Sequence, residues 1–281
     1  MEILTTKGWK DYELIDTGNG YRLERFGKFV LARPDPQIIW KPRLSQDVWQ
    51  KADATFTEGK WQLRTDVPEK WLLKYKGLSF WAKLTPFKHT GVFPEQHLQW
   101  DWLTKKIALS KSETKILNLF AYTGISTLVA ASLGAEVTHV DSSRPTIGWA
   151  RDNQKASNLD SKPIRWILDD ALKFATREVK RGQKYDAIIM DPPSFGHGPE
   201  GETWEFNNSF PRLMEICHQL LSDKPLFVLI NTYAISSSCL MLENVLKDFF
   251  PKGFIEVGEL VLEEKDSARK LSTGIFGRWS P

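Results

Sequence analysis

Small or acidic residues follow each of five short apolar segments in this sequence. These residues are Phe120–Gly124, Asp141, Asp169-Asp170, Asp191–Phe195 and Asn231–Tyr233. In the first two, Gly124 would let the backbone approach a ligand closely, and the Asp141 carboxylate could accept hydrogen bonds from ribose hydroxyls. These residue types in this order predict a nucleoside-binding site.

The segment 115–141 has the pattern of a β-α-β unit, which would position both groups. Residues 116–120 are a short apolar run typical of a buried parallel strand, residues 126–133 are small and apolar as in a helix packed on a sheet, and 137–140 are a second strand. A dinucleotide fingerprint would read G-x-G-x-x-G, whereas this turn has one glycine, so NAD is a poor candidate. An ordinary strand–turn–helix of an α/β domain has the same pattern, and this segment alone does not exclude it.

The rest of the second half repeats the alternation of strand and helix. The further strands expected are 164–168, 185–190, 226–230, 253–262 and 272–279, and the further helices are 146–158, 171–181, 206–221 and 236–250. This order predicts an α/β domain of β-α units closed by an antiparallel strand pair. Doubly wound sheets bind ligands at the carboxyl ends of their strands, which is where the polar segments would lie.

Residues 1–84 have the pattern of a small antiparallel β domain. Apolar residues alternate with polar ones in three segments separated by glycines, and further hairpins are expected around Gly59 and Gly77. We therefore expect two domains, 1–84 and 85–281. Residues 85–97 are rich in Pro, Gly and polar residues and lead into a helix over 95–108; from composition alone they are a linker.

Composition and length exclude several classes of protein. The 281 residues carry a net charge of +3. They contain no apolar run of the ~18 residues that a transmembrane helix needs, and no signal-peptide pattern. Two cysteines, Cys217 and Cys239, are too few for a disulfide framework or a metal cluster. We therefore expect a cytoplasmic protein with no metal site and no contact with a membrane.

Basic charge and tryptophan are concentrated in the first hundred residues. That stretch holds 16 Lys and Arg against 12 Asp and Glu, a net charge of +4, and seven of the twelve Trp. Aromatic side chains among basic residues can stack on nucleic-acid bases. The favoured interpretation for most of these Trp residues is that they fill the core of the small β domain.

Four motifs and one loop together resemble the class I S-adenosylmethionine-dependent methyltransferases. They are Asn118–Gly124, Asp141–Ser143, Asp169–Ala171, Asp191–Phe195 and the loop Lys88–Gln96. More closely, the chain is similar to large-subunit ribosomal RNA methyltransferases with a small β domain before the catalytic one. The resemblance implies a seven-stranded Rossmann-like α/β sheet with a closing antiparallel pair. It also implies S-adenosylmethionine as cofactor, S-adenosylhomocysteine as product, and RNA, ribosomal RNA in particular, as partner.

The resemblance further implies roles for individual residues. Around the cofactor, Phe120, Ala121 and Gly124 would surround the methionine part, Asp141 would hold the ribose, Asp170 would accept the adenine amino group, and Lys88, Thr90, Phe93 and Gln96 would close over it. At the acceptor, Asp191, Pro192, Pro193 and Phe195 would be catalytic, and Ser194, Asn231 and Tyr233 would contact the substrate. Asp169 or Asp170 could instead serve only as the cap of a helix beginning at Ala171.

The acceptor motif departs from the family's D-P-P-aromatic pattern, because Ser194 places Phe195 one residue late. Cytosine C5 methylation needs a nucleophilic Cys, and the family's positions for it hold Ser194 and Thr232-Tyr233. We therefore expect methyl transfer to an RNA nucleobase without a covalent Cys intermediate, with a purine nitrogen still open. The alternatives are a methyltransferase acting on a protein or small molecule, and an inactive RNA-binding module with the same fold.

Overall fold

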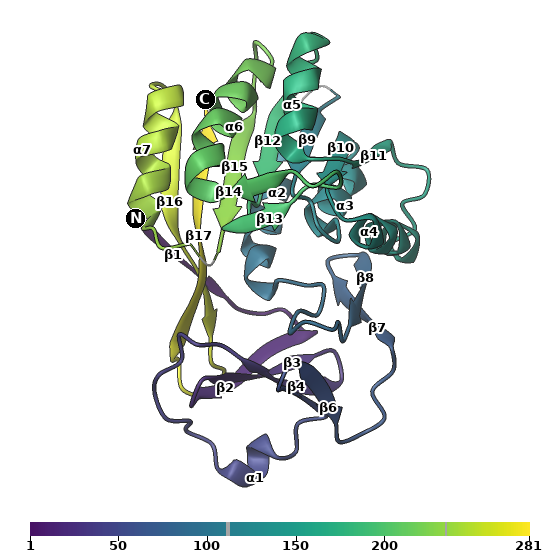
Figure 1. The fold of residues 1–281 in the computed structure, drawn as a ribbon, viewed down its shortest axis with the longest axis vertical. Coiled ribbons are helices and arrows are strands. Elements are labelled where there is room, and N and C mark those ends of the chain that lie inside the picture. Colours follow the sequence, from purple (N-terminus) through teal and green to yellow (C-terminus); the bar gives the residue numbers. More distant parts are fainter. Residues whose placement is uncertain (111–112, 234) are drawn as a thin grey trace. The chain divides into compact units, whose positions relative to one another are not determined.

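The computed structural model of the chain describes residues 1–110, 113–233 and 235–281 (Figure 1). Their contacts form two compact units. Unit 1 comprises 1–4, 98–260 and 273–281, and unit 2 comprises 5–97 and 261–272. The segment 85–97 and the connection 261–272 thus group with the N-terminal β strands. The division into independently folding domains at residue 84 stays a prediction.

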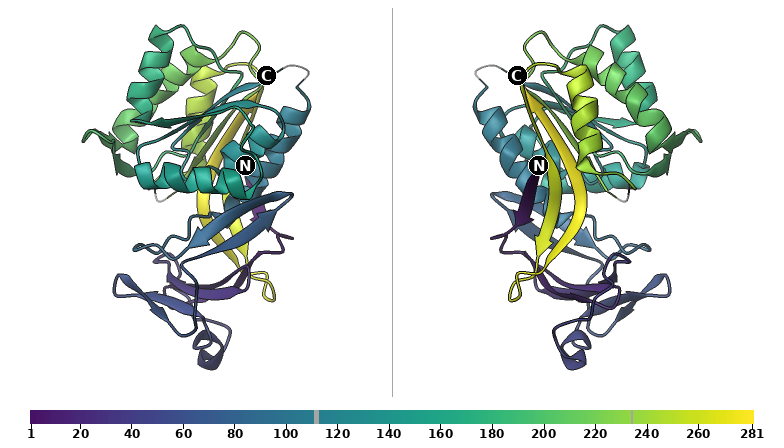
Figure 2. Two further views of the ribbon diagram at one scale, coloured as in Figure 1. Left: turned by 90° about the vertical axis from the view of Figure 1, so that its right-hand side faces the viewer. Right: turned by 90° about the vertical axis from the view of Figure 1, so that its left-hand side faces the viewer.

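Unit 1 is built on a mixed β-sheet. In spatial order its strands are β1 (Glu2–Thr6), β16 (Phe254–Glu263), β17 (Lys270–Ser280), β15 (Phe227–Thr232), β12 (Ala187–Met190), β9 (Lys115–Leu119), β10 (Glu136–Asp141) and β11 (Ile164–Leu168). The strands from β11 to β15 are parallel, and β17 runs antiparallel to β15. The long strands β16 and β17 lie side by side (Figure 2).

This topology confirms the predicted Rossmann-like sheet with a closing antiparallel pair. The order of the parallel strands reverses between β9 and β12, so the switch point of the sheet lies at the ends of these two strands. The described residues add an eighth strand, because β1 extends the edge next to β16. Alternation in five residues was too short a signal to predict β1 from the sequence.

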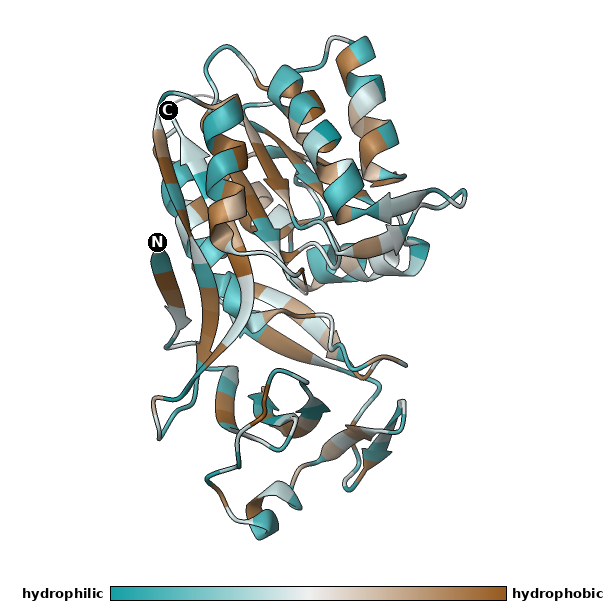
Figure 3. Ribbon diagram, turned by 60° about the vertical axis from the view of Figure 1, so that its left-hand side comes forward, coloured by the Kyte–Doolittle hydropathy of each residue, from teal (hydrophilic) through white to brown (hydrophobic). Residues whose placement is uncertain are grey.

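The hydrophobic core of unit 1 lies between the parallel strands and helices α5 (Ala171–Lys180), α6 (Phe206–Leu220) and α7 (Cys239–Phe249). These helices stand side by side along one face of the sheet (Figure 1). The other helices are α2 (His97–Ala108), α3 (Ile125–Ser132) and α4 (Arg144–Ala156). Figure 3 shows hydrophobic residues concentrated in the sheet of unit 1. The central parallel strands β12 and β15 are buried along their whole length, as expected of strands that are covered on both faces.

Residues 195–205, where no strand was expected, form a short β-hairpin. Its strands are β13 (Phe195–His197) and β14 (Thr203–Glu205). The turn closes where the Gly198 N–H donates to the Glu202 carbonyl at 2.8 Å. The hairpin could not be predicted from the sequence for two reasons. Its strands have only three residues, which is too short to show a periodic pattern, and the segment is rich in Gly and Pro.

Unit 2 is a β unit with a five-stranded sheet and a separate hairpin. The sheet contains β2 (Tyr12–Gly18), β3 (Tyr21–Phe26), β4 (Phe29–Pro34), β5 (Ala54–Thr57) and β6 (Lys60–Leu63), and the hairpin contains β7 (Lys70–Tyr75) and β8 (Leu78–Lys83). One pair, β4 with β5, is parallel and the other pairs are antiparallel. The short helix α1 (Gln46–Trp49) lies in the connection that makes this parallel pairing possible.

Most tryptophans of unit 2 are structural, as the sequence favoured. Trp9 and Trp71 are buried, and their indole N–H groups donate to the carbonyls of Lys74 and Phe26. The half-buried Trp40, Trp49 and Trp61 also donate to groups of unit 2. An indole N–H that is removed from water needs such a partner.

Candidate active site

The turn after β9 has an unusual backbone. Phe120, Tyr122 and Gly124 have positive φ angles of 54°, 50° and 80°. A Cβ on Gly124 would lie 3.0 Å from the Ala150 Cβ and 3.3 Å from His139 Cε1. Glycine is therefore required at position 124 for two reasons. Its φ angle is positive, and the start of α3 lies too close to Ala150 and His139 for a side chain. Non-glycine residues in the left-handed region store strain, which is characteristic of ligand-binding turns.

The Asp141 carboxylate holds this turn from the end of β10. Its Oδ2 accepts from the Tyr122 N–H and its Oδ1 from the Ser143 N–H, each at 2.9 Å. Burial raises the pKa of Asp141, and the hydrogen bonds from Ser143 and Tyr122 oppose that shift. Each carboxylate oxygen can accept a further hydrogen bond, so the group remains able to bind hydroxyls.

Asp169 and Asp170 have different surroundings at the end of β11. Asp170 caps α5, because its Oδ1 accepts from the Lys173 N–H at 2.8 Å. Asp169 forms an ion pair with Arg177. The predicted helix cap is thus Asp170, which is also the residue expected at adenine. A carboxylate has a second oxygen, so capping and ligand binding by Asp170 are compatible.

A narrow recess brings several predicted residues together at the strand ends. It is lined by Phe120, Val140, Asp141, Ser142, Asp169, Asp170, Ala171, Pro193, Gly196, His197 and Trp204. The enclosed space is about 40 Å³, which is room for only a few water molecules. A wider opening of about 560 Å³ adjoins it, since Ser142 and Asp169 line both.

Trp204 closes one side of the narrow recess, a role that no pattern in the sequence predicted. Its ring centroid lies 4.7 Å from that of Phe120, edge to face. Its Nε1 donates to the Pro193 carbonyl at 2.7 Å. Lys173 pairs with Glu200 at 3.2 Å and also with Glu202. These contacts hold the β13–β14 hairpin against the strand ends.

The Asp191–Phe195 segment follows β12 at the switch point. Its proline carbonyls already accept hydrogen bonds, the Pro192 carbonyl from Thr232 Oγ1 at 3.1 Å and the Pro193 carbonyl from Trp204. Ser194 and Phe195 are exposed, and 57% of Phe195 is accessible to solvent. The Phe195 ring lies 5.1 Å from that of His197 at an angle of 88°. An exposed aromatic ring therefore stands beside the predicted methyl-transfer position.

Asn231 and Tyr233 differ in their surroundings. Asn231 is buried, and its Oδ1 accepts from Gln99 Nε2 at 2.7 Å. Gln99 Oε1 in turn accepts from Arg278 Nε at 2.7 Å. These two hydrogen bonds, which we call the Arg278–Gln99–Asn231 relay, hold the Asn231 amide oxygen against Gln99 in unit 1. Tyr233 is half-buried just beyond β15.

The four predicted cofactor residues of the loop 88–96 belong to unit 2. Lys88 Nζ donates to the Pro34 carbonyl at 3.3 Å, and burial lowers the pKa of this ammonium group. Thr90 is buried, whereas Phe93 and Gln96 are half-buried. The Gln96 N–H donates to the Phe93 carbonyl at 3.1 Å, which starts the 3₁₀ turn Pro94–Gln96.

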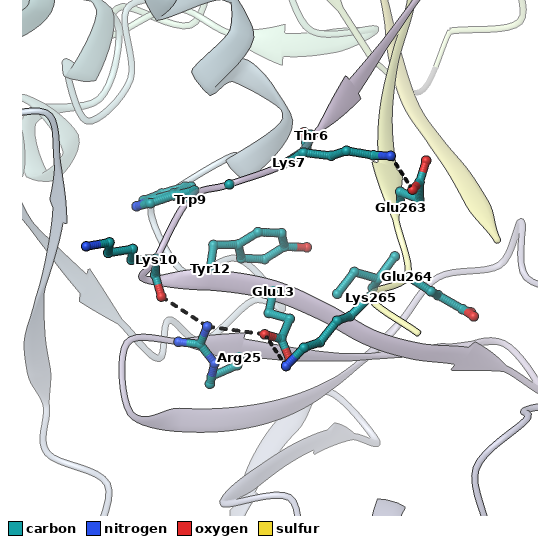
Figure 4. Close-up of a pocket in the computed structure, with 12 residues that line it drawn as sticks. Thr6, Lys7, Trp9, Lys10, Tyr12, Glu13, Arg25, Glu263, Glu264 and Lys265 are labelled. Carbon is teal, nitrogen blue, oxygen red and sulfur yellow. Dashed lines mark hydrogen bonds and ion pairs between the residues drawn. The ribbon is translucent and has the colours of Figure 1, made fainter. Parts of the chain in front are cut away.

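A separate recess of about 420 Å³ lies within unit 2 (Figure 4). Its charged side chains pair with one another. Lys7 contacts Glu263 at 2.7 Å, and Glu13 contacts both Arg25 at 3.5 Å and Lys265 at 3.2 Å. These ion pairs join the start of unit 2 to residues 261–272, so the recess has a structural explanation.

Residues 1–110, 113–233 and 235–281 contain no group of three or more His, Cys, Asp or Glu side chains placed to hold a metal ion. Within the same ranges, no helix combines the length and apolar character needed to cross a bilayer.

The topology of the sheet and the polar residues at the carboxyl ends of its parallel strands together define a class I methyltransferase architecture. The profile of the S-adenosylmethionine-dependent methyltransferase family matches residues 48–269, and the chain belongs to that family. The structure is similar to that of an S-adenosylmethionine-dependent methyltransferase from Agrobacterium tumefaciens, with a TM-score of 0.97 and 42% identity over 100% of this chain and 94% of that one. The predicted enzyme class and cofactor are thereby confirmed.

Other similarities are partial. A structure complexed with SAH aligns with a TM-score of 0.76 at 19% identity, over 97% of this chain and 76% of that one, which shows the fold alone. The ribosomal RNA large subunit methyltransferase K of Neisseria meningitidis is 28% identical over 60% of this chain and 44% of its own length. The corresponding K/L protein of Shewanella loihica is 36% identical over 60% of this chain and 22% of its own. The chain spans less than half the length of these curated relatives.

Proposed function

We propose that the chain transfers a methyl group from S-adenosylmethionine to a nucleobase of RNA, and of ribosomal RNA in particular. The observation that carries the proposal is the recess at the carboxyl ends of β9, β10, β11 and β12, which is lined by Asp141, Asp170 and Pro193 of the 191–195 segment. The names of the partial relatives support RNA as the acceptor. The charge of unit 2 agrees, because its 19 Lys and Arg exceed its 14 Asp and Glu by five.

The hydrogen-bond acceptors around the recess fit the cofactor. Asp141 offers carboxylate oxygens to the ribose diol, and Asp170 offers one to the adenine amino group. The backbone of Phe120, Ala121 and Gly124 would follow the methionine part, because the positive φ angles of Phe120 and Gly124 fold it into a tight turn after β9. Lys88, Thr90, Phe93 and Gln96 remain proposed cofactor contacts, as the family resemblance implies. The cofactor supplies an activated sulfonium methyl, so the protein has to align the acceptor and exclude water.

The acceptor side favours direct transfer. Cys217 and Cys239 are both buried, and burial raises the pKa of the Cys217 thiol well above its usual range. A buried, protonated thiol is a poor nucleophile, which supports a route without a covalent Cys intermediate. The occupied carbonyls of Pro192 and Pro193 leave less capacity to bind an amino group. A purine ring nitrogen that carries no proton, such as N7, fits this arrangement better, because its methylation requires no proton to be removed.

Phe195 is the proposed stacking residue for the target base. Its exposure lets an extruded base reach the ring. Asp191 would orient that base beside the methyl group. Ser194 and Tyr233 would contact its edge or its sugar. The buried Asn231 would act indirectly, by fixing the strand end through Gln99.

A tracer experiment separates the proposal from its alternatives. Purified protein and methyl-labelled S-adenosylmethionine are incubated with RNA, protein and metabolite fractions from a strain lacking the gene. Label in RNA, together with one ribosomal nucleotide that loses its methyl group in the deletion strain, is the expected result. Label only in protein or metabolites would support the second class of acceptor. An inactive RNA-binding module would give no label, and its RNA affinity would not change with Asp191→Ala.

A further inference from the structure

Helix α2 carries a stripe of three side chains that contact the sheet of unit 1. They are Gln99, Trp102 and Lys106, whose spacings of three and four residues place them on one side of the helix. The Trp102 ring centroid lies 5.1 Å from that of Phe227, and Lys106 Nζ donates to Ser280 Oγ at 2.8 Å. The stripe therefore packs along β15 and β17.

Arg278 of β17 is buried beneath this stripe. Its guanidinium carbon lies 4.9 Å from the Trp102 ring centroid and 4.8 Å from that of Phe276. Burial lowers the pKa of the guanidinium to about 10, with Glu256 opposing the shift, so the group is protonated at neutral pH. A protonated guanidinium has donors only, so the atom that receives its Nε–H must be an acceptor.

That donor fixes the direction of the Arg278–Gln99–Asn231 relay. Arg278 Nε donates to Gln99 Oε1 at 2.7 Å, so the other branch of the Gln99 amide is Nε2, which donates to Asn231 Oδ1 at 2.7 Å. An amide whose oxygen is held in this way has its nitrogen on the other side. Asn231 therefore offers N–H donors, and no acceptor, on the side away from Gln99.

Asp191 is the residue that comes beside Asn231 in the neighbouring strand. β12 and β15 are parallel, with Met190 opposite Ile230, so Asp191 and Asn231 take the next position along each chain. Paired residues of parallel strands, which lie about 4.8 Å apart, direct their side chains to the same face. Met190 and Ile230 both lie in the core under α5, α6 and α7. We therefore expect the Asp191 carboxylate on the opposite face, where Gln99 contacts Asn231.

We propose that Arg278 and Gln99 are positioning residues that make Asn231 present its amide N–H, and not its oxygen, to the Asp191 carboxylate. This inference rests on the proposed function, because Asp191 is the residue proposed to orient the methyl acceptor. An N–H group attracts a carboxylate, whereas an amide oxygen in its place would repel it. The relay thus runs from a buried cation to an anion at the acceptor site, with the N–H end of each amide directed toward that anion.

Two substitutions of Gln99 distinguish positioning from a purely structural role. Gln99→Glu keeps a partner for Arg278 and Asn231, but a carboxylate only accepts, so the Asn231 amide must rotate and turn its oxygen toward Asp191. Gln99→Met removes the partner of Arg278 Nε and of Asn231 Oδ1, so the relay no longer directs the amide. The kcat of methyl transfer should therefore fall about 10- to 100-fold in Gln99→Glu and about 2- to 10-fold in Gln99→Met.

The unfolding temperature should rank these two variants the other way. Gln99→Met removes the acceptor of a buried guanidinium N–H, so it should unfold at a lower temperature than Gln99→Glu. Affinity for S-adenosylhomocysteine, measured by calorimetry, should match that of the wild type in both, because the relay does not hold the cofactor. Lys106→Met is the control, since it removes another polar contact between α2 and β17 and should leave kcat unchanged.

Substitutions of Arg278 test the same direction if Gln99→Glu does not fold. Arg278→Lys keeps a group that can only donate, whereas Arg278→Gln introduces an amide that can donate or accept. Only the first forces the relay in its present direction, so Arg278→Lys should have the higher kcat.

Two results would overturn the inference. One is a kcat for folded Gln99→Glu equal to or above that of Gln99→Met, and the other is a kcat for Arg278→Gln equal to or above that of Arg278→Lys. Rates are measured with RNA from a strain that lacks the gene. If the label enters RNA while either order fails, the proposed function stands and the positioning role falls. If only protein or metabolite fractions are labelled, the proposed function falls, and the expected orders measured with that acceptor would still support the positioning role.

Discussion

The Tyr122 N–H donates to Asp141 Oδ2 at 2.9 Å, and this bond ties the turn after β9 to the end of β10. The same carboxylate accepts from Ser143 through its other oxygen. The side chain proposed to hold the ribose therefore also fixes the backbone proposed to hold the methionine part. Changes at Asp141 should affect cofactor binding through both routes.

Asp141→Ala is expected to weaken binding of S-adenosylhomocysteine by about tenfold or more, because hydrogen bonds to a charged group contribute roughly 1.5–3 kcal/mol. Asp141→Asn should be intermediate, since its amide can accept on one atom only. Isothermal titration calorimetry measures both. Asp160→Ala, at an exposed carboxylate, is the matched control. An affinity of Asp141→Ala for S-adenosylhomocysteine within twofold of that control would contradict the proposed role of Asp141 in cofactor binding.

Gly124→Ala is expected to destabilise the protein more than Gly134→Ala. Both glycines have positive φ, 80° and 92°, so both variants incur about 1–2 kcal/mol of backbone strain. Only at Gly124 would the new Cβ meet another atom, the Ala150 Cβ at 3.0 Å, whereas nothing lies within 4 Å at Gly134. Overpacking adds roughly 1–3 kcal/mol. Urea unfolding of the two variants gives the difference, and equal losses would show that the close approach is unimportant.

The strand ends could be predicted from the sequence because parallel strands leave a strong local pattern. An apolar run that stops at a polar residue, as in Ala187–Met190 before Asp191, marks both the strand and its functional end. The position of β9 between β10 and β12 then follows from the fold class. This strand order brings the carboxyl ends of the three strands together.

The closure of the recess could not be predicted in the same way. Trp204 lies in a three-residue strand, and its role depends on contacts with Phe120 and with the Pro193 carbonyl. The Arg278–Gln99–Asn231 relay joins residues that are far apart in the chain. Such contacts depend on tertiary packing, which leaves no local signal in either partner.

Cofactor binding is expected to move the β13–β14 hairpin. The narrow recess holds about 40 Å³ and adjoins a wider opening of about 560 Å³, so a nucleoside that enters the narrow part is expected to displace Trp204, Phe120 or the hairpin. S-adenosylhomocysteine should therefore change hydrogen exchange in residues 195–205. It should also change tryptophan emission, and Trp204→Phe should reduce that change while Trp102→Phe should not. Unaltered exchange in 195–205 at saturating ligand would refute this expectation.

The double variant Cys217→Ala/Cys239→Ala is expected to retain methyl transfer. Both sulfurs lie in the core of unit 1, so their loss should cost about 1–2 kcal/mol of stability through packing and should leave turnover nearly unchanged. Activity is measured below the unfolding temperature of the variant. Loss of turnover in a folded double variant, with cofactor affinity intact, would revive a covalent route.

Stability is expected to depend on pH through Glu95. Burial raises the pKa of this carboxyl to about 7, with the Arg22 guanidinium opposing the shift, Glu24 adding to it and Arg33 opposing it. A raised pKa means that the folded state binds the proton more tightly than the unfolded state. The stabilisation is therefore present below the unfolded value near 4.5 and is lost as pH rises through about 7.

Glu95→Gln should keep the neutral form at every pH. It should match the wild type near pH 5 and exceed it by about 1–3 kcal/mol near pH 8, given 1.36 kcal/mol per pKa unit. Urea unfolding across this range measures the difference, with Glu69→Gln as the exposed control. A wild type that gains stability relative to Glu95→Gln as pH rises would mean that Arg22 and Arg33 outweigh burial, and that Glu95 is ionised in the folded protein.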